Sequence, residues 1–150
     1  MGAQLLLGQG LSEIIKAVSR LAAVPGRMEQ LQFPDDVSVV IDYAHTPDAV
    51  AQAVQALLPL AQSRGGELIC VLGCGGDRDA AKRPLMAAAA EQYAQHVVLT
   101  SDNPRSEDPQ AILAQMVAGL RAPEQARALP DRADAIAQAV AHALPQDVVL

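Results

Sequence analysis

Apolar residues in this chain follow two patterns, short continuous runs and repeats every three or four positions. The short runs cover residues 37–41, 68–72 and 96–100 and are rich in Val, Ile and Leu. Runs of this length bounded by turn residues are typical of strands buried on both faces of a sheet. They alternate with helical patterns of about 10–15 residues, which indicates parallel strands joined by right-handed crossovers, with helices on both faces of the sheet.

The helical spacing predicts five helices and two further short strands. Ser12 is a candidate N-cap of the first helix, and Thr46 before Pro47 is a candidate N-cap of the second. Pro84 is expected to open the third helix, because proline is tolerated in the first turn. The predicted helices cover residues 11–23, 47–62, 84–95, 109–120 and 133–144, and the further strands cover residues 126–129 and 147–150.

The chain of 150 residues is long enough for one domain with a short appendage. Residues 24–27, Val-Pro-Gly-Arg, end the first helix and form a candidate hinge. That helix could pack on the following domain or be the tail of a preceding one, and the Pro-Gly boundary favours the tail. We therefore expect a tail and hinge over residues 1–24 and a domain over residues 25–150. The domain is expected to be incomplete, because its last strand stops where a functional loop should follow.

Composition narrows the classes of partner. Apolar residues make up 51% of the chain and aromatic residues only 2%, so the core must consist mainly of Ala, Val, Leu and Ile. The net charge of −6 argues against a nucleic-acid partner held by counterion release. No apolar run approaches the roughly 20 residues of a membrane span, and no basic leader segment is present. We expect a cytoplasmic protein without a membrane partner.

The two cysteines are expected to carry no chemistry. Cys70 and Cys74 are too few for a disulfide framework or a structural zinc site. Cys70 lies inside an apolar run, which predicts a buried thiol. The sequence likewise shows no Ser-His-Asp arrangement and no metal-ligand cluster, so we assign neither catalytic nor metal-binding residues.

Three polar loops follow the first three predicted strands: residues 42–48, 73–83 and 101–107. The carboxyl ends of parallel strands meet at one edge of the sheet, where open α/β sheets bind ligands. Each loop carries charged or hydrogen-bonding groups that a purely structural turn does not require. We expect the candidate site at this edge.

The second loop begins with Gly73-Cys74-Gly75-Gly76 but does not match a phosphate-binding motif. No Gly-Lys-Ser/Thr follows, and Asp77 would repel a pyrophosphate. In one interpretation the loop is a tight turn in which Arg78 pairs with Asp77 or Asp79. In the other, Arg78 is available to a ligand.

The third loop presents Arg105 directly after Asn103-Pro104. An arginine fork matches a carboxylate with two parallel hydrogen bonds, which lysine cannot do. Arg105 could also be a surface residue paired with Glu107 or Asp108. Two arginines on neighbouring loops favour a ligand that carries a carboxylate.

The first loop has groups suited to a nucleoside. Asp42 could accept a hydrogen bond from a ribose hydroxyl, and Tyr43 or His45 could lie against a base. The structural alternative is that Asp42 and Thr46 are only caps.

Taken together, these residues resemble one family closely. Four motifs occur in order: Gly26-Arg27-Met28-Glu29, Asp42-Tyr43-Ala44-His45-Thr46-Pro47-Asp48, Gly73 to Asp79 with Lys82-Arg83-Pro84, and Asp102-Asn103-Pro104-Arg105. They are similar to the C-terminal domain of MurE-type Mur ligases, the UDP-N-acetylmuramoyl-L-alanyl-D-glutamate–2,6-diaminopimelate ligases of peptidoglycan synthesis. The resemblance covers nearly the whole chain from Leu5 onward and implies a Rossmann-like fold.

The resemblance implies ATP-dependent amide formation, with magnesium present, between meso-diaminopimelate and the UDP-N-acetylmuramoyl dipeptide. It implies that Arg27, Asp42 and His45 face ATP. It also implies that Arg78 grips a diaminopimelate carboxylate and that Asp102, Asn103, Pro104 and Arg105 form the recognition motif for this amino acid. Family members that use lysine differ at the position of Arg105. An arginine built for the second carboxylate would be left unpaired by lysine, at a cost of a few kcal/mol as an order of magnitude.

The chain departs from the family in what it lacks. The central domain, with its P-loop and magnesium ligands, is absent, and so are the final strands with a Gly-Lys-Gly-His-Glu loop. We therefore expect the isolated chain not to be a working ligase. The alternative is a non-catalytic binding or interaction module derived from this domain. A sister ligase such as the folate-polyglutamate enzyme is a further alternative, and the motif at residues 102–105 argues against it.

Overall fold

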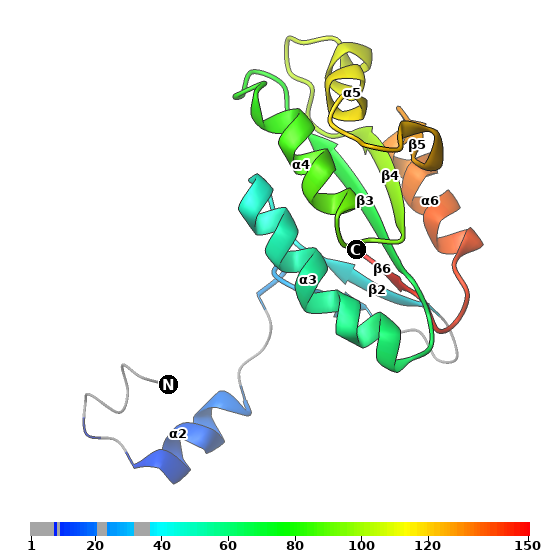
Figure 1. The fold of residues 1–150 in the computed structure, drawn as a ribbon. Coiled ribbons are helices and arrows are strands. Elements are labelled where there is room, and N and C mark those ends of the chain that lie inside the picture. The colour runs from blue at the N-terminus through cyan, green and yellow to red at the C-terminus, as the bar shows by residue number, and fades with distance from the viewer. Residues whose placement is uncertain (1–7, 9, 21–23, 32–36) are drawn as a thin grey trace.

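The structure is a computed structural model that describes residues 8, 10–20, 24–31 and 37–150. These residues form a six-stranded sheet with several helices packed on it (Figure 1). The strands are β1 (Glu29–Leu31), β2 (Ser38–Ile41), β3 (Leu68–Cys74), β4 (His96–Ser101), β5 (Arg127–Leu129) and β6 (Val148–Val149). The helices are α2 (Leu11–Val18), α3 (Pro47–Ser63), α4 (Lys82–Glu91), α5 (Pro109–Val117) and α6 (Arg132–His142), with a 3₁₀ turn η1 (Pro123–Gln125).

The strand order is β1-β2-β6-β3-β4-β5, and every neighbouring pair except β1–β2 is parallel. The chain moves outward from β2 through β3 and β4 to β5, and then returns to insert β6 between β2 and β3. Right-handed crossovers that move in one direction put α3, α4 and α5 on one face, and the return crossover puts α6 on the other (Figure 1). The structure thus confirms the α/β fold with a mostly parallel sheet and helices on both faces.

The core consists of one apolar cluster on each face of the sheet. Val54, Leu72 and Met116 belong to the cluster beneath α3, α4 and α5. Ile69 and Ala135 belong to the smaller cluster beneath α6. Residues along β3 alternate between the two clusters because successive side chains of a strand point to opposite faces. Burial on both faces explains why this strand has a continuous apolar sequence.

The predicted elements are all present where the structure describes them, although several boundaries differ. The helix α4 begins at Lys82, so Pro84 lies inside its first turn and does not open it. The N-cap of α2 is Gly10 and not Ser12, and α2 ends at Val18. Residues 21–23, which we expected to continue this helix, lie outside the described residues.

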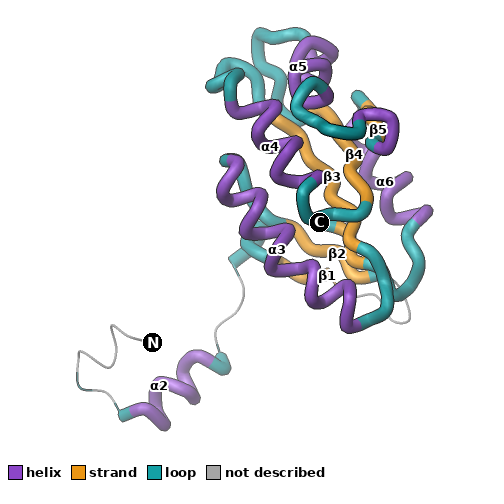
Figure 2. Tube along the Cα trace, viewed as in Figure 1, coloured by secondary structure: helices purple, strands orange, loops and turns teal. Residues whose placement is uncertain are grey.

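The strand β1 was not predicted from the sequence. It has only three residues, and it pairs antiparallel with β2 at the edge of the sheet. Two of its three residues are exposed, so it carries no apolar run by which it could be recognised. Figure 2 shows β1 beside β2.

The start of α3 is formed as predicted. The Ala49 backbone N–H donates to Thr46 Oγ1 at 3.2 Å, and Pro47 is at the first helical position. Asp108 and Asp131 cap α5 and α6 in the same way. Among the described residues, no helix is long and apolar enough to cross a lipid bilayer.

Candidate functional site

The polar loops converge on the carboxyl edge of the sheet, as predicted. The loops after β3 and β4 are neighbours there, because these strands pair along their whole length. The loop after β2 lies on the other side of β6, which separates β2 from β3. Leu150 follows β6 between them and continues the pairing with β3, since its N–H donates to the Ile69 carbonyl at 2.9 Å. The edge therefore carries two clusters of polar residues.

The first cluster is built by direct contact between the glycine loop after β3 and the loop after β4. The Gly76 N–H donates to the Asn103 carbonyl at 2.9 Å. A Cβ atom on Gly76 would collide with the Pro104 carbonyl, and one on Gly75 would lie 2.9 Å from Arg105 Nη1. Neither glycine has a positive φ angle. These glycines are therefore required so that the loop after β4 can approach closely. They are not required for a turn conformation or a phosphate cradle.

Two non-glycine residues in these loops adopt the left-handed conformation. Asp77 and Arg105 both have a φ angle of 51°. Ser106 Oγ donates to Asp77 Oδ1 at 2.6 Å, and Arg105 Nη1 donates to the Gly76 carbonyl at 2.6 Å. Each loop thus restrains the left-handed residue of the other. Such conformations persist only where surrounding contacts over-determine them, and they concentrate at functional sites.

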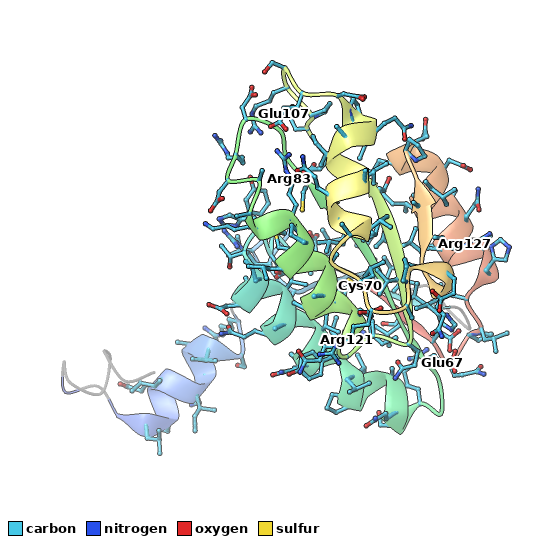
Figure 3. All side chains as sticks on the ribbon, turned by 45° about the horizontal axis from the view of Figure 1, so that its top comes forward. Glu67, Cys70, Arg83, Glu107, Arg121 and Arg127 are labelled. Atoms are coloured by element: carbon cyan, nitrogen blue, oxygen red, sulfur yellow. The ribbon has the colours of Figure 1, made fainter. Side chains whose placement is uncertain are left out.

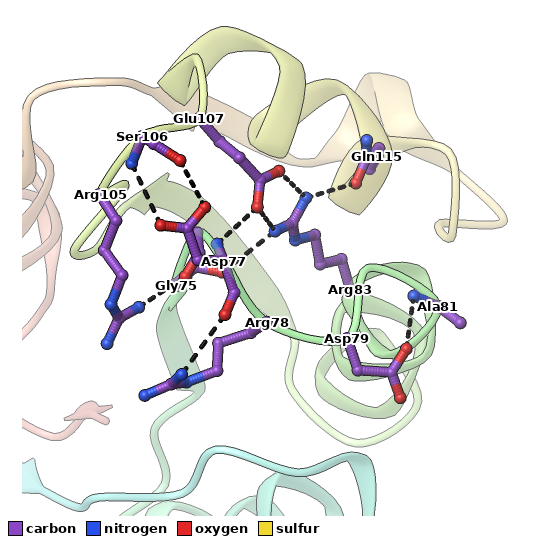
Figure 4. Close-up of polar contacts among 11 residues, drawn as sticks. Gly75, Asp77, Arg78, Asp79, Ala81, Arg83, Arg105, Ser106, Glu107 and Gln115 are labelled. Atoms are coloured by element: carbon purple, nitrogen blue, oxygen red, sulfur yellow. Dashed lines mark hydrogen bonds and ion pairs between the residues drawn. The ribbon is translucent and has the colours of Figure 1, made fainter.

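An ion pair between a buried arginine and a partly exposed glutamate joins the base of the same two loops. The Arg83 side chain, from the first turn of α4, is 2% exposed and forms a bidentate pair with Glu107, with both N···O distances 2.7 Å. Arg83 also donates to Gln115 Oε1 at 2.7 Å and to the Gly75 carbonyl at 3.2 Å. Figure 4 shows this network, and Figure 3 shows Arg83 and Glu107 together at one end of the molecule.

The charges of this pair are fixed by their hydrogen bonds. Hydrogen bonds from Arg83, and then from the Asp77 N–H, lower the pKa of Glu107 to about 2. The bond to Glu107 raises the pKa of Arg83 above its ordinary value. Both groups are therefore ionised at neutral pH.

Sequence reasoning did not single out Arg83. The sequence does contain a sign that Arg83 is buried, because Arg83 falls on the same helical stripe as the buried Met86, Ala87 and Ala90. A cation at a helix N-terminus is also unfavourable unless a carboxylate accompanies it.

Arg78 and Arg105 lie on the two contacting loops. Arg78 Nη1 donates to the carbonyl of Asp77 at 3.3 Å. Within the described residues, Arg78 forms no ion pair with Asp77 or Asp79, which was the alternative interpretation of this loop. The Asp77 carboxylate accepts from Ser106 Oγ, and Asp79 Oδ2 lies 3.9 Å from Lys82 Nζ. Figure 4 shows the guanidinium groups of Arg78 and Arg105 pointing to the same side of the loop pair, away from Arg83.

The alternative partners of Arg105 are also engaged elsewhere. Glu107 binds Arg83, and Asp108 caps α5 by accepting from the Gln110 N–H at 3.1 Å. The surface ion-pair interpretation of Arg105 is therefore wrong for the described contacts. Its guanidinium is held by a backbone carbonyl, which uses one of its N–H groups and leaves others for a ligand.

Asp102, Asn103 and Pro104 connect β4 to Arg105. Asn103 and Pro104 form the backbone surface on which Gly76 rests. Asp102 lies beside Gly73, where a Cβ atom would be 3.0 Å from both the Asp102 Cβ and Arg132 Nη1. Arg132, at the start of α6, also donates to the Ser101 carbonyl at 3.4 Å. It is a fourth arginine near this loop pair and, like Arg83, was assigned no role from the sequence.

The second cluster contains Arg27, Asp42 and His45, the three residues that the family resemblance implies face ATP. Asp42 Oδ2 accepts from the Met28 N–H at 2.9 Å, so Asp42 does not cap a helix but holds the segment before β1. The Arg27 guanidinium lies 5.2 Å from the centroid of the Tyr43 ring, and the His45 ring meets the same ring edge-on at 5.7 Å. Tyr43 is 67% exposed, so it offers an open aromatic surface flanked by a cation.

The two cysteines carry no chemistry at the site. Cys70 and Cys74 are buried free thiols, and burial raises their pKa values to about 12 and about 11, so neither is a nucleophile at neutral pH. In the part of the chain that the structure describes, no group of three or more His, Cys, Asp or Glu residues could hold a metal ion.

The fold and the two clusters define an α/β domain with charged and aromatic side chains gathered at the carboxyl edge of its sheet. The chain belongs to the Mur ligase family, because the family domain described as "Mur ligase, glutamate ligase domain" matches residues 26–150. Its relatives include the UDP-N-acetylmuramoyl-L-alanyl-D-glutamate–2,6-diaminopimelate ligases of Acidovorax sp. (56% identity over 96% of this chain) and Ralstonia nicotianae (51% over 100%). The chain spans 29% of the length of each of these two relatives.

Solved structures agree with this assignment. A diaminopimelate ligase structure of the same name matches 98% of this chain, and 30% of its own length, at 40% identity and a TM-score of 0.72. A folylpolyglutamate synthase from Mycobacterium tuberculosis, complexed with ADP, matches 94% of the chain and 32% of its own length at 23% identity and a TM-score of 0.68. The second likeness shows the shared fold alone.

Proposed function

We propose that this chain is the amino-acid-binding domain of a Mur ligase that adds meso-diaminopimelate to UDP-N-acetylmuramoyl-L-alanyl-D-glutamate, using ATP. The observation that carries the proposal is the pair of arginines, Arg78 and Arg105, on two hydrogen-bonded loops at the carboxyl edge. Among the described residues, neither guanidinium group forms an ion pair with a carboxylate, so both are suited to bind a carboxylate of the ligand. The names of the related ligases support diaminopimelate as the amino acid.

The arginines would act by orienting the amino acid. meso-Diaminopimelate carries an amine and a carboxylate at each end, so the end gripped by Arg78 and Arg105 is distant from the amine that reacts. Asp102, which lies beside Gly73 and three residues before Arg105, is suited to accept hydrogen bonds from the ammonium group of the gripped end. Holding that end fixed directs the other amine toward the activated D-glutamate carboxyl, which lowers the entropic part of the barrier.

The second cluster is suited to face ATP. Arg27, Tyr43 and His45 provide an aromatic surface with an adjacent cation for a base, and Asp42 provides a carboxylate. ATP, when bound, supplies the phosphoryl group that activates the D-glutamate carboxyl. The glycine loop cannot cradle phosphates, because the backbone of Asn103 and Pro104 occupies its surface. We place the triphosphate and magnesium ligands in a central domain outside this chain.

The domain boundaries follow from the same proposal. Residues 1–24 would be the tail of the central ATPase domain and a hinge, and residues 25–150 the C-terminal domain, incomplete at its end. The isolated chain would then be inactive in ligation. Use of ATP and a nucleotide-linked substrate places the parent enzyme in the cytoplasm.

A chimeric ligase tests this proposal. The matching 144 residues of the Acidovorax ligase are replaced by those of this chain, and phosphate release is measured with the nucleotide dipeptide and ATP. We expect release to depend on meso-diaminopimelate and not to occur with L-lysine. Arg105→Met should raise the KM for meso-diaminopimelate about tenfold to a hundredfold, because a hydrogen bond to a charged group contributes about 1.5–3 kcal/mol.

Arg127→Met, on β5, is the matched control and should leave the KM values for meso-diaminopimelate and for ATP unchanged. A folded chimera that ignores meso-diaminopimelate would disprove the proposal. An equal rise in the KM values for ATP and for meso-diaminopimelate in Arg105→Met would disprove the role of Arg105.

The alternative of a non-catalytic interaction module rests on one observation. Helix α2 exposes Leu11 and Ile15, which are 54% and 53% exposed. Sedimentation of the 150-residue chain distinguishes the two proposals, because an interaction module that self-associates through α2 would become monomeric on Leu11→Gln/Ile15→Gln substitution.

A further inference from the structure

Arg83 and Glu107 lie outside the groups that face a ligand. The Arg83 side chain is 2% exposed, and its guanidinium is directed at Glu107, Gln115 and the Gly75 carbonyl. Arg83 therefore cannot contact meso-diaminopimelate directly. The Glu107 side chain is 32% exposed, but both of its oxygens are engaged by Arg83 and the Asp77 N–H. The ion pair is also weak evidence for stability, because the desolvation of the buried Arg83 offsets much of its attraction to Glu107. Its position at the base of the candidate site calls for another explanation.

Glu107 is one of the residues that join the two loops, and it also joins them to α4. Its Oε1 accepts from Arg83 Nη2 at 2.7 Å and from the Asp77 N–H at 2.6 Å, while its Oε2 accepts from Arg83 Nη1 at 2.7 Å. Glu107 follows Arg105 by two residues, and Asp77 precedes Arg78 by one. One carboxylate thus fixes the backbone beside each of the ligand-facing arginines.

The same contacts hold both left-handed residues. The N–H that Glu107 accepts is that of Asp77, and the Asp77 carboxylate in turn binds Ser106 Oγ at 2.6 Å. Arg83 reaches the opposite side of the glycine loop through the Gly75 carbonyl. Releasing Glu107 would free Asp77 and Arg105 to leave the left-handed region, and the spacing of the two arginines would no longer be set.

We propose that Arg83 and Glu107 are positioning residues that set the spacing of Arg78 and Arg105 and thereby the selectivity of the site for an amino acid with a second carboxylate. This inference rests on the proposed function. The inference assigns part of the selectivity to the Arg83–Glu107 ion pair, in addition to the motif at residues 102–105 that is proposed to contact the ligand. A carboxylate bound by two arginines requires both at a fixed separation, which one flexible loop could not maintain.

The test uses Glu107→Gln in the chimeric ligase. The amide keeps the shape of the side chain but faces Arg83 with N–H groups, so the bidentate pair is lost. We expect the KM for meso-diaminopimelate to rise about tenfold or more while the KM for ATP is unchanged, because misplacement of orienting groups affects only the ligand they hold. Glu124→Gln, in η1, is the matched control and should behave as the parent.

The double variant Arg83→Met/Glu107→Gln separates positioning from stability. It removes the buried charge that Glu107→Gln leaves unpaired, so thermal stability should recover relative to the single variant. The KM for meso-diaminopimelate should stay raised, since the carboxylate that fixes the backbone beside Arg78 and Arg105 is still missing. Recovery of that KM together with stability would show a structural role only and would overturn the inference.

A measurement that needs no ligand distinguishes failure of the inference from failure of the proposed function. In ¹H–¹⁵N spectra of the 150-residue chain, Glu107→Gln should shift the amide signals of Gly76, Asp77 and Arg105, and Glu124→Gln should not. If the parent chimera ignores meso-diaminopimelate, the proposed function fails whatever these spectra show. If the parent chimera works and Glu107→Gln keeps its KM and its spectrum, only the inference fails.

Discussion

Gly76 shows how one residue can determine the geometry of the candidate site. Its φ angle is not positive, so other residues could adopt its backbone conformation. What excludes them is the Pro104 carbonyl, which occupies the space of a side chain. The glycines of this loop therefore bring a neighbouring arginine loop close, although their sequence resembles a phosphate-binding turn.

Gly76→Ala should separate the two loops. We expect a loss of about 1–3 kcal/mol in the free energy of unfolding, the range for inserting a methyl group into a filled space, and loss of the Gly76–Asn103 hydrogen bond. Urea denaturation measures the first, and amide hydrogen exchange at position 76 measures the second. Gly10→Ala is the control, because its Cβ would meet only Glu13 Oε2 at 3.9 Å. Protection from exchange at position 76 in the alanine variant would contradict this prediction.

The ionisation of Glu107 makes the loop contact dependent on pH. Its pKa is lowered from 4.5 to about 2 in the folded chain, so the ionised form favours folding. That contribution is fully present above about pH 4.5 and is lost as the pH falls toward 2. An NMR titration should show the Glu107 carboxyl and the Asp77 amide changing together near pH 2. Titration of Glu107 near 4.5 would show that the pair with Arg83 does not form in solution.

The secondary-structure elements differ in how far local sequence fixes their ends. Thr46, Asp108 and Asp131 each cap a helix through the side chain, and proline follows the first two caps. The start of α2 has no such side-chain bond, since Gly10 is its N-cap. Local hydrogen bonding is therefore enough to place the starts of α3, α5 and α6.

Thr46→Ala should lower the free energy of unfolding by about 1 kcal/mol, because the Ala49 N–H loses its acceptor. Ser12→Ala is the comparison, and it should have an effect close to zero because Ser12 is not the N-cap of α2. Urea denaturation of the two variants beside the parent measures both values. Equal destabilisation by the two substitutions would contradict the assignment of the caps.

In the molecule as a whole, both apolar clusters lie within residues 37–150. No residue of α2 belongs to either cluster. The sheet should therefore fold without the segment that we assign to a preceding domain.

Residues 25–150 expressed without residues 1–24 should unfold cooperatively, with a midpoint close to that of the 150-residue chain. The physical reason is that the truncation removes no residue of the two clusters. Thermal denaturation followed by circular dichroism measures the midpoint. A truncated chain that is unfolded, or that loses cooperativity, would show that the proposed boundary at residue 24 cuts through a folding unit.

The sequence was sufficient for the features that depend on local pattern. Continuous apolar runs identified β2, β3 and β4, helical spacing identified α3 to α6, and a Thr-Pro pair placed the start of α3. The alternation of these elements gave a parallel sheet, and hence the edge at which Arg78, Arg105 and Asp42 gather. These inferences succeed because burial and capping act over a few neighbouring residues.

Contacts between distant residues required the tertiary structure. The insertion of β6 between β2 and β3, the antiparallel β1 and the Arg83–Glu107 pair join segments from 8 to more than 100 residues apart, so no local pattern marks them. The partners of Arg78 and Arg105 were also undetermined, because Glu107 and Asp108 are near Arg105 in sequence yet bind elsewhere. A charged side chain pairs with whatever the fold brings to it, and packing between loops decides which group that is.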